Sequence, residues 1–125
     1  MGRAAHVPAP LSNDDRAAAM QDTDALCSKI DALLDASERG DLAHLEHTLT
    51  DGYAKALALE AERWRIEKRI AEVAGLIGSG DLGGGARELS GLVNRLERTD
   101  GELARLRGVL ADLRRRADVV RSAVA

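Results

Sequence analysis

The side chains that most often carry chemistry are few in this chain, and none of them has the spacing of a complete site. His44 and His47 lie three residues apart on one expected helix face, so both could bind one metal ion. A zinc site needs a third or fourth ligand. His6 and Cys27 are the other candidates, and nothing in the sequence brings them to the pair. We therefore predict no metal site and a solvent-exposed face at the two histidines.

The sequence also lacks a pattern that would indicate a catalytic nucleophile or an acid–base pair. Cys27 has no histidine at a spacing that suggests activation, so we interpret it as a small buried residue. Carboxylates are numerous, but they fall on the polar faces of expected helices and no pair is placed in a predicted cleft. We predict a non-enzymatic protein with no catalytic residue and no cofactor.

A glycine-rich segment has the spacing of a dinucleotide-binding loop. Residues 78–83 read Gly-Ser-Gly-Asp-Leu-Gly. That loop must follow a strand inside a parallel sheet, whereas a helix is expected before this one. No Lys-Ser or Lys-Thr follows, which excludes the other kind of phosphate-binding loop. The five glycines of residues 78–85 instead predict a turn between two helices.

The run Arg114-Arg115-Arg116 could contact phosphates, but Asp112 and Asp118 flank it. The whole chain has a net charge of −3. Residues 86–125 carry nine arginines and six acids (+3), and residues 1–85 carry nine basic and fifteen acidic residues (−6). Opposite charges on two arms favour their pairing, so we predict no nucleic-acid partner.

Two long heptad patterns provide the elements that would position these residues. In each, apolar or small residues recur at alternating gaps of three and four over eleven positions, which is typical of helices that pack side by side. The two patterns have equal length and are joined by the glycine-rich segment, so they predict an antiparallel helical hairpin. The first pattern is Leu42, Leu45, Leu49, Gly52, Ala56, Leu59, Arg63, Ile66, Ile70, Val73 and Ile77. The second is Leu89, Leu92, Leu96, Thr99, Leu103, Leu106, Leu110, Leu113, Ala117, Val120 and Val124.

The rest of the chain adds one element. We expect residues 1–11 to be disordered and residues 12–125 to form one helical domain, with helices at about 12–39, 41–77 and 86–123 and a hairpin loop at 78–85. Ser12 and Asp15 resemble a capping box, and Gly40-Asp41 predicts a kink or break. The expected fold is all-α: an antiparallel coiled-coil hairpin with an additional N-terminal helix, as a three-helix bundle or a dimeric bundle.

The equal patterns also predict a register in which the numbers of facing residues sum to about 166. Gly52 then falls near Leu113 and Ala56 near Leu110, so small residues meet large ones, as close packing requires. Arg63 falls opposite Leu103, from where its head could reach Glu60 or Glu67 on its own helix.

A second apolar stripe lies beside each pattern. Tyr53 and Trp64, the only aromatic residues, belong to it. Two interpretations remain open: the stripe is core beneath the N-terminal helix, or it anchors the helix of a partner protein or a second copy. Its members, which are our candidate partner-binding residues, are Tyr53, Leu57, Trp64, Val93 and Val109.

Composition limits the setting. The chain has 125 residues, enough for one domain, and a single cysteine, which fits a reducing cytoplasm better than secretion. No apolar run approaches the length that crosses a bilayer, and the N-terminus has no signal-like apolar core. We expect a cytoplasmic protein that does not bind membranes.

Residues 26–73 resemble the first long helix of FlgN-type flagellar export chaperones. The similar segments are Gly40-Asp41-Leu42, Leu45-Glu46, Ala56-Leu57 and Leu59-Glu60-Ala61-Glu62-Arg63. The resemblance implies a small, acidic, helical cytoplasmic protein that holds hook–filament junction subunits for export through helix-on-helix contact. The C-terminal forty residues do not follow the family's pattern.

Three functions follow as hypotheses. The first is a protein-binding module, with the flagellar chaperone as its most specific form. The second is a structural coiled coil that self-associates as a homodimer or larger helical bundle. The third is a helical-hairpin secretion-system substrate, although the loop lacks the Trp-x-Gly turn that such substrates carry.

Overall fold

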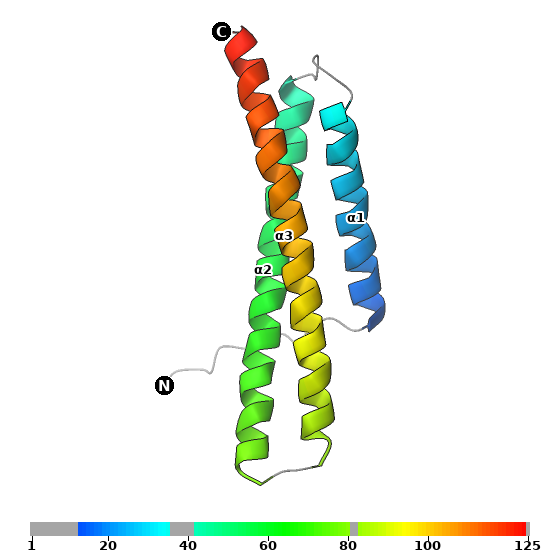
Figure 1. Cartoon of the computed structure of the whole chain (residues 1–125), viewed down its shortest axis with the longest axis vertical. Coiled ribbons are helices and arrows are strands. Elements are labelled where there is room, and N and C mark those ends of the chain that lie inside the picture. Colours follow the sequence, from blue (N-terminus) through cyan, green and yellow to red (C-terminus); the bar gives the residue numbers. More distant parts are fainter. Residues whose placement is uncertain (1–12, 36–41, 81–82, 125) are drawn as a thin grey trace, which may run out of the picture.

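The computed structural model describes residues 13–35, 42–80 and 83–124, and within these it consists of three helices without a strand. They are α1 (Asn13–Asp35), α2 (Leu42–Gly78) and α3 (Gly85–Val124). Figure 1 shows α2 and α3 side by side and antiparallel, with α1 running beside them in the direction of α3. The predicted all-α fold with an N-terminal third helix is therefore confirmed.

The helix ends agree closely with those predicted in the hairpin. The structure places them at 42, 78, 85 and 124, where 41, 77, 86 and 123 were expected. The predicted lead at 1–11, the cap at Ser12 and the break at Gly40-Asp41 lie outside the described residues.

The turn between α2 and α3 depends on two glycines. Gly80 and Gly84 have φ angles of 97° and 76°, in the left-handed region where a Cβ is strained. The Gly80 amide donates to the Ile77 carbonyl at 3.1 Å, which satisfies one of the free carbonyls at the end of α2. The glycine-rich segment is thus a helix-terminating turn between two helices.

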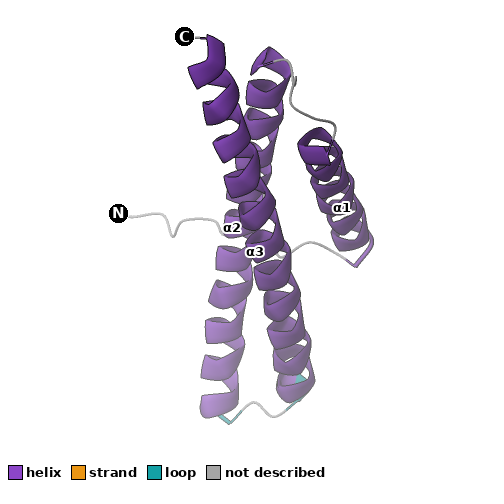
Figure 2. Cartoon of the chain, turned by 45° about the horizontal axis from the view of Figure 1, so that its top comes forward, coloured by secondary structure: helices purple, strands orange, loops and turns teal. Residues whose placement is uncertain are grey.

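The core divides into two apolar clusters along the hairpin. Cys27 and Ile30 of α1 belong to the first, together with residues from the beginning of α2 and the second half of α3. The second cluster lies toward the turn and contains residues of α2 and α3 only, centred on Ile66, Val73 and Leu92. Helix α1 therefore packs on only one half of the hairpin, as Figures 1 and 2 both show.

A polar layer separates the two clusters. At this layer one position of the predicted heptad pattern is wrong. Glu62 and Thr99 are buried there, whereas Arg63, which was predicted to face the partner helix, is exposed. The Arg65 guanidinium donates two hydrogen bonds to Glu62 Oε2, at 3.1 and 2.9 Å, and this compensates the burial of the carboxylate. Arg63 pairs with Glu67, as predicted, and also reaches Asp100 across the hairpin at 2.9 Å.

The register differs from the predicted one by about one helical turn. The nearest atoms to a Cβ built on Gly52 belong to Leu110, at 2.2 Å from Cδ2, where Leu113 was expected. Arg63 and Asp100 sum to 163, against the predicted 166. The rule behind the prediction holds, because the absent side chain of Gly52 makes room for a leucine.

Within the described residues no helix is long and apolar enough to span a membrane.

Candidate functional site

The side chains that could bind a metal ion or act as a nucleophile do not come together in one site. His44 and His47 are exposed, as predicted, and His47 Nε2 lies 3.5 Å from Asp51 Oδ2. Cys27 is fully buried, and this burial raises the pKa of its thiol, so the thiolate that a nucleophile needs is disfavoured. Among the residues that the structure describes, no three His, Cys, Asp or Glu side chains gather where a metal ion could bind.

The arginine run forms no single basic patch. Successive residues of a helix point in directions about 100° apart, and these three have different surroundings. Arg115 pairs with Asp112, Arg116 is half-buried, and Arg114 lines a groove beside α2. Of the three arginines, only Arg114 lines this groove.

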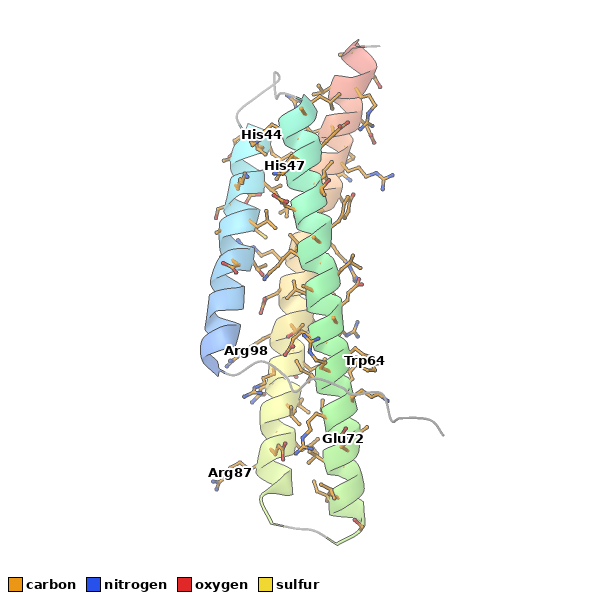
Figure 3. The ribbon with its side chains drawn as sticks, turned by 180° about the vertical axis from the view of Figure 1, so that it is seen from behind. His44, His47, Trp64, Glu72, Arg87 and Arg98 are labelled. Atoms are coloured by element: carbon orange, nitrogen blue, oxygen red, sulfur yellow. The ribbon has the colours of Figure 1, made fainter. Side chains whose placement is uncertain are left out.

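The second apolar stripe of α2 is open to solvent, which excludes the interpretation that α1 covers it. Tyr53 is 43% exposed, Leu57 66% and Trp64 48%. Figure 3 places Trp64 on the side of α2 away from α1. Tyr53 and Leu57 precede Trp64 by eleven and seven residues, close to whole numbers of turns, so they share its side. Helix α1 packs on the opposite side of the hairpin because its apolar residues join the cluster there.

The two valines of the predicted stripe separate. Val93 is exposed and lies one, two and three heptads before Asp100, Arg107 and Arg114, so it belongs to the same face of α3 as these residues. Val109 is partly buried and packs against the three-helix core cluster. Its place is fixed by α1, whose Asp24 pairs with Arg105, one turn before Val109. Val109 therefore does not belong to the exposed surface.

A groove of about 420 Å³ runs between α2 and α3 on this exposed side. A second hollow of about 340 Å³ continues it toward the C-terminal end of α3, and Tyr53 and Arg114 line both. We call this surface, from Tyr53 to Trp64 on α2 and from Val93 to Arg114 on α3, the open face. The first hollow is lined by Tyr53, Ala56, Leu57, Glu60, Arg107, Leu110, Ala111 and Arg114.

Charge on the open face is arranged around these apolar residues. Glu60 and Arg107 form an ion pair across the groove. Arg114 makes no ion pair with any residue in the described part of the chain. Lys68 Nζ lies 5.5 Å from the centre of the Trp64 ring and is held there by cation–π attraction. A carboxylate of a bound partner could therefore pair with the Arg114 guanidinium, which lines the groove together with the Tyr53 ring.

Sequence reasoning missed the charged and small members of the groove, such as Glu60, Arg107 and Ala111. The signal was present, because Arg107 and Arg114 lie one heptad apart, each one position after a core leucine. The other exposed large apolar residues, Leu76 and Val119, stand singly, which is ordinary for a protein surface. The open face is distinguished by having several of them beside a groove.

No protein-family model, curated protein or solved structure matches the chain.

Proposed function

We propose that this protein is a non-enzymatic helical module that binds an α-helix of a protein partner on its open face. The observation that carries the proposal is the exposed stripe of Tyr53, Leu57 and Trp64 beside the groove. Solvent-exposed aromatic residues next to arginines are the residue types that most often dominate the binding energy of protein interfaces. A helix with an apolar stripe fits a groove between two helices. The axes of two packed helices lie about 8–10 Å apart, which leaves such a groove along their contact.

The resemblance to FlgN-type chaperones gives this proposal a specific form, in which the bound helix belongs to a hook–filament junction subunit in the cytoplasm. The similar segments lie on α2 and in the two residues before it, 40 and 41, and the open face is built partly on α2. The secretion-substrate hypothesis has no observation in its favour. Self-association is a second form of the proposal, in which the bound helix comes from another copy of the chain.

Trp64 makes the chaperone form directly testable, because it is the only tryptophan in the chain. A tryptophan-free helical segment of a hook–filament junction subunit is titrated into the protein while the emission of Trp64 is recorded. Binding on the open face should shift the emission to shorter wavelength and saturate. An unchanged emission at saturating segment would remove the chaperone form.

Leu57→Asp tests the open face itself. Compared as monomers, the variant and the wild type should melt within about 0.5 kcal/mol of each other, because Leu57 is mostly exposed in the folded chain. We expect it to lose binding by at least about tenfold, because the aspartate would place a charge in the apolar centre of the contact. Calorimetry measures the first effect and the titration the second. Wild-type binding in the variant would show that partners dock elsewhere.

A further inference from the structure

The two helices of the open face carry unlike side chains. The α2 side presents large apolar residues with acids between and beside them: Glu46, Tyr53, Leu57, Glu60 and Trp64. Across from them, the α3 side presents small residues with arginines between them: Ala104, Arg107, Ala111 and Arg114. Val93 and Asp100, which pairs with Arg63, continue this side toward the turn. Each helix therefore has what the other would need in a packing partner.

These complementary residues also stand at the same height along the hairpin. Two ion pairs connect α2 to α3 at different heights along the hairpin. They are Glu60–Arg107 and Glu46–Arg121, and in the second Glu46 Oε1 lies 2.8 Å from the Arg121 guanidinium. The groove places Tyr53 level with Ala111 and Arg114, since all three line it together. Leu57 lines the same groove as Arg107, one turn beyond Ala104.

A two-fold axis parallel to the helices would use this matching. Such an axis turns one copy to face the other without changing heights, so that α2 of each copy lies against α3 of the other, in opposite directions. Tyr53 then meets the partner's Ala111, and Leu57 lies between the heights of the partner's Ala104 and the partner's Arg107, so that large side chains pack beside small ones. The side-chain ends of Glu60 and Arg107 pair within each chain, so Glu60 also comes within reach of the partner's Arg107, and Tyr53 within reach of the partner's Arg114.

The alternative two-fold, perpendicular to the helices, would place α2 against α2. The acidic side would then face itself and the arginines would face one another, which is unfavourable.

The area of the open face also suits a dimer. From Val93 to Arg114 the open face is about 32 Å long, and two helices are about 20 Å wide, which gives about 600 Å² per copy, at the lower end of specific interfaces. Stable interfaces bury about 800 Å² per partner.

We propose that the helix bound on the open face is α3 of a second copy of this chain, in an isologous dimer in which each α2 packs against the partner's α3. The inference rests on the proposed function, because it names the occupant of the same face. The assembly has a four-helix centre made of two hairpins, with one α1 on each outer side.

A charge exchange between two variants tests this pairing. Glu60→Arg and Arg107→Glu are prepared separately and as a double variant, and all are studied by sedimentation equilibrium over a wide concentration range. Both side chains are about half exposed, and surface pairs contribute little to stability. Circular dichroism melting of each variant confirms that the helices remain folded.

We expect the wild type to dimerise reversibly and each single variant to raise the dimer dissociation constant at least about tenfold, because four like charges would meet at one height. A 1:1 mixture of the two variants should regain wild-type dimerisation, since each copy supplies the charge that the other needs. The double variant should regain it as well.

Three outcomes would overturn the dimer: a wild type that stays monomeric, single variants that dimerise like the wild type, or a mixture that stays as weak as its components. The proposed helix-binding function can be tested separately from the dimer. A monomeric chain whose Trp64 emission still responds to the junction segment retains the helix-binding face and loses only the second copy as occupant. A chain in which Leu57→Asp alters neither assembly nor binding loses both.

Discussion

Leu106→Asp is expected to abolish the folded helical bundle. Leu106 is 0% exposed and lies in the core cluster that all three helices share. Removing a buried leucine side chain costs about 2–5 kcal/mol, and an unpaired carboxylate in the same place adds several more. The sum is comparable with the whole stability of a small domain, about 5–15 kcal/mol. Circular dichroism at 20 °C and thermal melting measure the effect.

Leu57→Asp is the matched control for this experiment, because it makes the same chemical change on an exposed position of the neighbouring helix. Leu106→Ala should give an intermediate result, with a cooperative transition at lower temperature and a loss of about 2–5 kcal/mol. A Leu106→Asp protein that keeps the helicity and melting temperature of the wild type would show that this pattern does not face the core.

Gly52→Val is expected to destabilise the protein by about 1–3 kcal/mol, the usual cost of overpacking a core. A Cβ at this position would lie 2.2 Å from Leu110 Cδ2 and 3.2 Å from its Cγ, and Leu110 is itself buried. The leucine must therefore leave its rotamer or the two helices must move apart. Chemical denaturation measures the free energy of unfolding.

Gly108→Ala provides the control, because a Cβ there meets nothing within 4 Å. In that position the better helix propensity of alanine should stabilise the protein by about 0.5–1 kcal/mol. Combining Gly52→Val with Leu110→Ala should cost less than the sum of the two single changes, since the smaller side chain removes the clash. Additive costs, or a Gly52→Val variant as stable as the wild type, would place the two helices in another register.

The heptad patterns predicted the hairpin because they depend on one strong effect, the burial of apolar side chains at regular gaps. Positions such as Leu59, Leu103 and Leu113 are buried as expected. The pattern could not predict the exchange of Arg63 for Glu62, because an acid is buried only where a partner compensates its charge, and that partner, Arg65, lies off the pattern.

The position of α1 was the least predictable part. Its apolar residues Leu26, Ile30, Leu33 and Leu34 show that it packs, but they do not say on which side of a hairpin with two apolar flanks it does so. That choice decides whether Tyr53 and Trp64 are core or surface. The structure resolves it in favour of the surface, and it moves Val109 to the covered side.

The central claim is that a helix packs on the open face, and acrylamide quenching of Trp64 across a dilution series tests it most directly. With Trp64 48% exposed in the single chain, quenching should be efficient at low protein concentration. It should decrease as the protein concentration rises, over the same range in which sedimentation shows the dimer forming. Efficient quenching that stays constant while the protein dimerises would place the contact on another face and contradict the claim.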